Sequence, residues 1–242
     1  MTLMSLPKSN VDVFNRDASA GEGYLYTATS RLSCRLATER SLEAILETGQ
    51  FAGRSVVDMG CGDGHYTIRL WDRSHPRALT GLDAAEVAIQ RAIEHKQDRP
   101  IRFAVGDAHK LPFADNSFDV ALVQSILHHD DKPADIIREA FRLAPVILIH
   151  EPNGNNFGLK VIEKCSRYHR EHAEKSYSSR KIARWIGQAG GEIQWKRFAG
   201  FVPMFCPEWL ARIMKAVEPL IEGTPCLRVL GCAVFVVVAK RK

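Results

Sequence analysis

The sequence lacks the cysteine patterns of a disulfide scaffold or a zinc site. Its six cysteines form no CxxC pair, which predicts reduced, mostly buried thiols, a cytoplasmic location and no metal site. It also lacks a signal peptide, because residues 1–14 are mixed and polar, and the apolar run at 230–239 is too short to span a bilayer. Internal repeats and low-complexity tracts are absent. These absences argue against secreted disulfide-rich, membrane-spanning and repeat architectures.

What remains has the composition of an ordinary globular chain. The 242 residues are 45% hydrophobic and 25% charged, which allows one large domain with a sizeable core. The net charge of +5 is unevenly placed, since residues 160–197 contain ten Lys or Arg against four Asp or Glu. A basic patch there would suit an acidic substrate, a lipid headgroup or nucleic acid, whereas a solvated helix face is the simpler explanation.

A glycine-rich stretch from Ser55 to Thr67 organises the sequence. Three glycines, Gly60, Gly62 and Gly64, follow an apolar strand-like run and precede a helix-like one. Glycine allows tight turns and the close approach of a ligand, and a helix that starts after such a turn presents its first N–H groups to that ligand. Taken alone, the stretch is compatible with a ligand-binding loop and with a plain loop.

Hydrophobic periodicity predicts strands and helices that alternate along the chain. Strands are expected at 55–59, 78–83, 101–105, 118–123, 146–150, 191–201 and 231–240. Helices are expected at 31–48, from 66 onwards, and at 84–96, 133–143, 178–189 and 207–221. The alternation indicates an α/β fold with a Rossmann-like, doubly wound and mostly parallel sheet.

Carboxylates end three successive predicted strands, at Asp58, Asp83 and Asp107. The carboxyl ends of parallel strands share one edge of a sheet, where ligands bind, although each acid taken singly is also compatible with a helix N-cap. The GxGxG spacing departs from the dinucleotide pattern GxGxxG. Asp58 beside the turn would repel a pyrophosphate but suit an ammonium or sulfonium group. These features favour S-adenosylmethionine over a nicotinamide dinucleotide.

Four motifs in order resemble those of class I S-adenosylmethionine-dependent methyltransferases of the small-molecule, natural-product type. They are VVDMGCGDG at 56–64, GLDA at 81–84, GDAHKLPF at 106–113, and FDVA at 118–121 with the histidine pair at 128–129. The resemblance implies a seven-stranded sheet with an antiparallel last strand. It also implies that the glycine loop holds the methionyl part of the cofactor, that Asp83 binds the ribose and that Asp107 contacts the adenine amine. The cofactor-binding residues implied are Asp58, Gly60, Cys61, Gly62, Gly64, Asp83, Ala84, Asp107, Ala108, Gln124 and Ser125.

The resemblance divides the single domain into four parts. These are an N-terminal arm and cap helix (1–50), a cofactor-binding core (51–151), a lid insertion (152–177) and a segment that completes the sheet (178–242).

The arm carries Tyr24, Tyr26 and Arg31, and we expect it to close over the cofactor, with Tyr26 as a binding residue. The sequence departs from the family at Gln124-Ser125-Ile126-Leu127, where no Asn-Pro-Pro-Tyr motif stands. This departure disfavours methylation of a DNA base amine.

Four residues at the same edge are candidates for catalysis: His128, His129, His150 and Glu151. A base there would help an oxygen acceptor, whereas a histidine pair that only caps the next helix is an equal alternative. Glu151 is expected to contact the acceptor.

The function predicted is methyl transfer to an oxygen or nitrogen of a small or carrier-linked acceptor, such as a natural product, a sugar or a related metabolite. The basic lid suggests an anionic acceptor, and nucleic acid is disfavoured because no aromatic-interleaved basic groove is visible. A monomer and a homodimer both remain open. The alternatives are a non-catalytic S-adenosylmethionine-binding subunit and a nicotinamide-dependent oxidoreductase.

Overall fold

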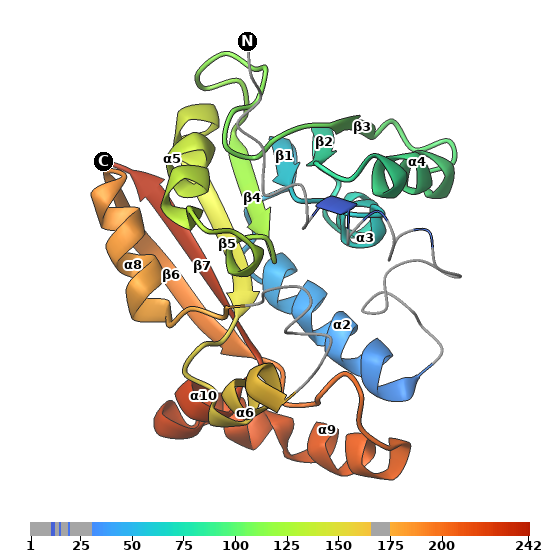
Figure 1. Ribbon diagram of the computed structural model, residues 1–242, viewed down its shortest axis with the longest axis vertical. Coiled ribbons are helices and arrows are strands. Elements are labelled where there is room, and N and C mark those ends of the chain that lie inside the picture. Colours follow the sequence, from blue (N-terminus) through green and yellow to red (C-terminus); the bar gives the residue numbers. More distant parts are fainter. Residues whose placement is uncertain (1–10, 13–14, 16–18, 20–30, 166–174) are drawn as a thin grey trace.

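The architecture comes from a computed structural model that describes residues 11–12, 15, 19, 31–165 and 175–242. A seven-stranded sheet forms its centre (Figure 1). The strands are β1 Ser55–Met59, β2 Ala78–Asp83, β3 Arg102–Val105, β4 Val120–Gln124, β5 Val146–Pro152, β6 Gly191–Ala199 and β7 Val234–Arg241. The helices are α2 Leu32–Leu46, α3 His65–Ser74, α4 Glu86–His95, α5 Pro133–Leu143, α6 Phe157–Cys165, α8 Ser179–Gln188, α9 Glu208–Gly223 and α10 Pro225–Gly231, with a 3₁₀ turn η1 at Leu127–His129.

The strand order is β3-β2-β1-β4-β5-β7-β6. The first five strands pair in parallel, and β7 runs antiparallel to both β5 and β6. The expected mostly parallel sheet with an antiparallel last strand is therefore confirmed. In this topology the carboxyl ends of β1 to β5 meet at one edge, so the predicted site residues are brought together.

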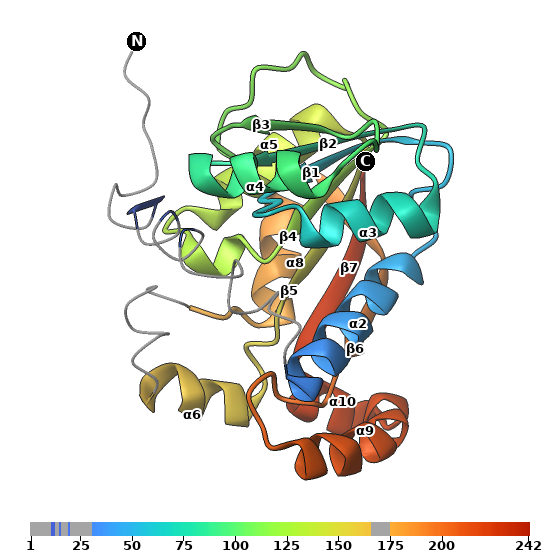
Figure 2. The same cartoon turned by 90° about the vertical axis from the view of Figure 1, so that its right-hand side faces the viewer.

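Side-chain alternation along β1 divides the core between the two faces of the sheet. Val57 and Met59 pack on the face covered by α5 and α8, whereas Val56 packs on the opposite face with residues of α2 and α3. Figures 1 and 2 show these helices on the two sides of the sheet. Both faces of the central strands are thus buried, as the continuous apolar runs of a parallel sheet require.

The end of the chain differs from the expectation. The final strand starts at Val234 rather than at 231, because residues 225–231 form α10 with Pro225 in its first turn. Strand β4 starts at Val120, two residues later than expected, and β5 continues to Pro152. Helices α6, α9 and α10 gather beyond one end of the sheet, at the bottom of Figure 1. No helix in the described part of the chain is long and apolar enough to cross a bilayer.

Candidate active site

The glycine turn closes the carboxyl end of β1. Gly60, Gly62 and Gly64 have φ angles of +85°, +55° and +79°, in the left-handed region that favours glycine. A Cβ at Gly60 would lie only 1.8 Å from Cγ2 of Ile126, so a larger residue does not fit. Gly64 is the N-cap of α3, and the turn therefore leads directly into the amino end of that helix.

Asp83 joins the glycine turn to the start of α4. Its Oδ2 accepts a hydrogen bond from the backbone N–H of Gly62 at 2.9 Å, and its Oδ1 accepts one from Ala85 at 2.8 Å. Burial raises the pKa of Asp83, although these two amides favour its charged form. A carboxylate has about four lone-pair sites, so acceptor capacity remains for the hydroxyl groups of a ligand.

Asp107 pairs with a histidine that the sequence did not single out. His109 bonds Asp107 through Nδ1 at 2.9 Å and Asp130 through Nε2 at 3.2 Å. The hydrogen bonds to Asp130 and Asp107 raise the pKa of His109 to about 9, so the ring is charged at neutral pH. The Asp-x-His spacing is visible in the sequence, but Asp130 follows η1 and reaches this group only in the folded chain.

The structure corrects the position expected for Asp58. Its side chain is buried on the α3 side of the sheet, where Oδ2 accepts a 2.6 Å hydrogen bond from Thr67 Oγ1. It does not line the cavity described below, because the strand places the side chains of Val57 and Met59 on the other face. Burial raises the pKa of Asp58 to about 7. Asp58 therefore supports α3 behind the turn.

Ser125 and His150 form the edge between β4 and β5. Ser125 has a φ of +53°, and its N–H donates a 2.8 Å hydrogen bond to the carbonyl oxygen of His150. Its Oγ lies 3.3 Å from Nδ1 of His150. His150 is only 3% exposed, and burial lowers its pKa to about 4, so the imidazole is neutral. Its Nε2 is buried without a hydrogen-bond partner among the described residues.

Glu151 is a second correction, because its carboxyl group does not line the cavity. Its Oε1 accepts backbone hydrogen bonds from Ile126 at 2.9 Å and Leu127 at 2.8 Å, and its Oε2 lies 2.8 Å from Nδ1 of His128. Burial raises the pKa of Glu151 to about 8. Glu151 therefore holds η1 and the ring of His128 in place.

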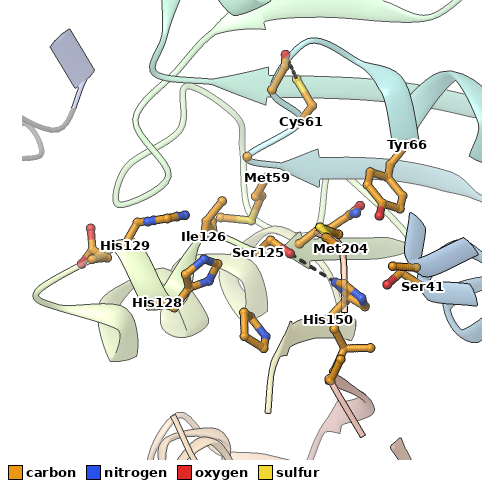
Figure 3. A pocket seen from close by; sticks show the side chains of 18 of the residues that line it. Ser41, Met59, Cys61, Tyr66, Ser125, Ile126, His128, His129, His150 and Met204 are labelled. Atoms are coloured by element: carbon orange, nitrogen blue, oxygen red, sulfur yellow. Dashed lines mark hydrogen bonds between the residues drawn. The ribbon is translucent and has the colours of Figure 1, made fainter. Parts of the chain in front are cut away.

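A cavity of about 730 Å³ connects these groups, within the range typical of small-molecule sites (Figure 3). The predicted residues that line it are Gly60, Cys61, Gly62, Asp83, Ala84, Asp107, Ala108, Gln124, Ser125, His128, His129 and His150. Gly64 caps α3 and does not line the cavity, and Tyr26 lies outside the described residues.

Sequence reasoning missed the wall that comes from α2 and α3. Tyr66 lines the cavity, and its hydroxyl is hydrogen-bonded to Thr38 and Ser41. Burial raises the pKa of Tyr66 to about 12, and its ring centroid lies 6.5 Å from that of His150. No local signal marks these residues, because the two helices meet only through the packing of the fold.

The charges of the lining residues test which cofactor fits. Asp63, Asp83, Asp107 and Asp130 line the cavity, whereas no lysine or arginine does so in the described part of the chain. The one cationic ring among the described lining residues, His109, is held between Asp107 and Asp130, so a pyrophosphate would meet mainly carboxylates there. A cationic sulfonium ligand with a ribose fits the same acids, because Asp83 keeps acceptor capacity for hydroxyl groups.

Comparison with known proteins agrees with this geometry. Residues 57–145 match a family model described as a methyltransferase domain. The 27-O-demethylrifamycin SV methyltransferase of Amycolatopsis mediterranei is 33% identical over 123 residues, which are 49% of this chain and 42% of that protein. The ubiquinone/menaquinone biosynthesis C-methyltransferase UbiE of Desulfotalea psychrophila is 31% identical over 100 residues, 41% of this chain and 40% of that protein. The tRNA U34 carboxymethyltransferase of Wolinella succinogenes is 29% identical over 91 residues, which are 37% of this chain and 32% of that protein.

The chain spans less than half the length of these three relatives. A solved structure of a SAM-dependent methyltransferase from Thermotoga maritima, described as a possible histamine N-methyltransferase, has the same fold. It superposes with a TM-score of 0.68 at 17% identity, and the match covers 96% of this chain and 99% of that one.

Fold and site together define a Rossmann-like protein of the class I methyltransferase architecture. The matched domain and the residues at the sheet edge make the assignment more specific. Residues 57–145 carry a methyltransferase domain, within a fold shared with an S-adenosylmethionine-dependent methyltransferase.

Proposed function

We propose that this protein transfers the methyl group of S-adenosylmethionine to an oxygen or nitrogen of a small or carrier-linked acceptor. One observation carries the proposal: a single cavity runs from the glycine turn, past Asp83 and Asp107, to the buried pair of His128 and Glu151. The named relatives act on different acceptors, so the choice of a small molecule rests on the volume of the cavity, about 730 Å³.

When bound, S-adenosylmethionine supplies an electrophilic methyl group on its sulfonium. The chain's own residues hold the acceptor against it, and positioning of this kind contributes about 7–11 kcal/mol of the barrier. His128 is the group we assign as proton acceptor, because its Nδ1 is held by Glu151 and its ring lines the cavity. A positioned base contributes about 10²–10⁴-fold. The ring of His129 lies against that of His128, with the centroids 3.8 Å apart and the planes tilted by 43°, and it supports the orientation of His128.

The insertion at 152–177 is proposed as the lid over the acceptor. In its described part, Asn156 accepts a hydrogen bond from Leu159 at the start of α6, and Lys175 N–H donates one to the carbonyl oxygen of His128 at 2.9 Å. The lid is therefore attached to the element that carries the proposed base. The lid residues Tyr168, His169 and His172 lie outside the described residues.

Binding of S-adenosylhomocysteine tests the cofactor part of the proposal. Asp83→Ala removes the acid that joins the turn to α4, and we expect at least a tenfold loss of affinity, about 1.4 kcal/mol, in isothermal titration calorimetry. Glu94→Ala is the matched control, since Glu94 is exposed on the same helix. Equal affinity in both variants would remove Asp83 from the cofactor site. Methyl transfer from labelled cofactor into a metabolite extract then separates an enzyme from a non-catalytic subunit.

A further inference from the structure

Beyond His150 the cavity continues into a compartment that the cofactor motifs do not supply. Its walls come from α6, from residues 200–205 between β6 and α9, and from α9. In Figures 1 and 2 these elements lie at the end of the molecule away from α4. The apolar side chains of this compartment include Leu159, Ile162, Val202, Met204, Phe205 and Met214. An acceptor bound here buries its body against hydrocarbon and thioether groups.

In the described part of the chain, no lysine or arginine lines the compartment. Among the described residues of its walls, Glu163 is the one charged side chain. Both of its oxygens are engaged: Oε2 with Lys160 Nζ at 2.9 Å, and Oε1 with the N–H of Ser176 at 3.0 Å. Lys175 pairs with Asp131 outside the cavity. The described lining therefore favours an uncharged acceptor over the anionic one that the basic composition of residues 160–197 suggests.

His150 lines the cavity where the compartment begins, and it is a buried polar residue available to an acceptor. The ring is neutral, Nδ1 faces Ser125 Oγ, and Nε2 has no hydrogen-bond partner among the described residues (Figure 3). A buried polar atom without a partner costs about 1–3 kcal/mol, so a ligand that satisfies Nε2 is favoured. A hydroxyl group both donates and accepts, and it therefore matches either tautomer of the ring. A protonated amine would need a carboxylate, and that of Glu163 is already paired.

We propose that the acceptor is an uncharged, hydrophobic molecule with a hydroxyl group, whose apolar body fills this compartment and whose hydroxyl meets Nε2 of His150. The proposal rests on the proposed methyl transfer and specifies the substrate class of the same site. It makes His150 a residue that determines specificity, beside the base assigned to His128.

Two probes with the same ring system test the charge preference. Binding of 2-naphthol and of 6-hydroxy-2-naphthoate is measured by fluorescence with the full chain saturated with S-adenosylhomocysteine. The naphthol is expected to bind at least about tenfold more tightly, because the carboxylate would be buried without a partner. Equal or tighter binding of the carboxylate would overturn the proposal, and so would the absence of naphthol binding. Failure of S-adenosylhomocysteine to bind would count against the proposed function instead.

Variants of Met204 locate the compartment. The carbonyl oxygen of Met204 accepts hydrogen bonds from Ser33 Oγ at 2.7 Å and Cys34 Sγ at 3.0 Å, so a side-chain change leaves these anchors in place. Met204→Lys is expected to weaken naphthol binding and to strengthen naphthoate binding, each by about tenfold. Met204→Leu, the matched control, keeps the preference for naphthol. An unchanged preference in Met204→Lys would place the acceptor elsewhere.

The hydroxyl contact is tested by comparing 2-naphthol with naphthalene. In the native protein the hydroxyl is expected to improve binding about fivefold, as for one neutral hydrogen bond, and His150→Phe should abolish this advantage. His150→Gln, which keeps a donor and an acceptor, should restore part of it. A hydroxyl advantage that survives in His150→Phe would exclude this residue from acceptor recognition.

Discussion

Glu151→Gln replaces one oxygen of a buried carboxyl group by an N–H donor at the point where His128 is held. The amide oxygen still accepts the backbone hydrogen bonds of Ile126 and Leu127, so η1 is retained. The amide N–H, however, must donate to Nδ1 of His128, which places the ring proton on Nε2. In that tautomer the nitrogen that we assign as the base no longer accepts a proton.

The size of the expected effects on turnover, cofactor affinity and stability follows from these contacts. Loss of a positioned base lowers kcat by about 10²–10⁴-fold, while the affinity for S-adenosylhomocysteine should change by less than about twofold because Glu151 lies outside the cavity. Glu151→Ala, in contrast, breaks a buried pair and costs about 3–5 kcal/mol. For a chain of this size that corresponds to a fall in Tm of about 6–20 °C.

The pH dependence of turnover provides a second test of the role of Glu151. Burial raises the pKa of Glu151 to about 8, so below that pH the pair with His128 holds an additional proton and Nε2 is protonated. Turnover in the native protein is therefore expected to rise as the pH increases through about 8. In Glu151→Gln this rise should be absent.

The assay combines nitrogen NMR of the His128 ring with methyl transfer to 2-naphthol or to the acceptor found in the extract. Protonation on Nδ1 is expected in the native protein above pH 8, and on Nε2 in the variant. If the tautomer changes while turnover and its pH profile stay the same, His128 is not the base. If the tautomer is identical in both proteins, the hydrogen bond between Glu151 and His128 does not have the assigned role.

Three further predictions concern the turn, the histidine bridge and the interior. In Gly60→Ala the added Cβ would lie 1.8 Å from the side chain of Ile126. The variant should therefore lose about 1–3 kcal/mol of its free energy of unfolding, measured in urea, and should bind S-adenosylhomocysteine more weakly. An unfolding curve identical to that of the native protein would refute the steric argument. The pKa of His109 is about 9 in the folded protein and about 6.5 in the unfolded chain. The contribution of the charged His109 ring to folding stability is therefore complete below pH 6.5 and is lost as the pH rises through 9. The difference in Tm between the native protein and His109→Gln should therefore narrow from pH 6 to pH 10, and a constant difference would contradict the bridge. Arg40→Met leaves the carboxylate of Glu222 buried without its 2.7 Å partner and should lower the free energy of unfolding by about 3–5 kcal/mol in thermal denaturation. Adding Glu222→Gln to this variant should restore part of the lost stability. A loss below about 1 kcal/mol in Arg40→Met would show that the pair is not buried in solution.

Much of the fold is determined by local sequence. Strands β1 and β2 and helix α5 start and end at the residues expected, because apolar runs, glycines and Pro133 mark their limits within a few positions. Helix α8 starts close to the expected position because Ser178 caps it: its side chain accepts a hydrogen bond from the N–H of Lys181. The acids at the ends of β2 and β3 reach the shared edge because parallel topology places every carboxyl end there.

What the tertiary structure decided is the direction and pairing of individual side chains. Asp58 stands in the same motif as Gly60, yet the alternation of the strand turns it towards Thr67 and away from the cavity. Glu151 follows His150 directly, yet it is bound inside the fold, while the histidine lines the cavity.

Folding also decided which charges of the basic segment are paired. The basic composition of residues 160–197 suggested an anionic acceptor, but Lys160 pairs with Glu163, Lys175 with Asp131 and Arg197 with Glu222. Composition counts charges, whereas a binding site depends on which charges remain unpaired at its wall. Those pairings join residues that are in part distant in the chain, so local patterns determined the sheet edge that carries the motifs, and only folding determined which charges are paired.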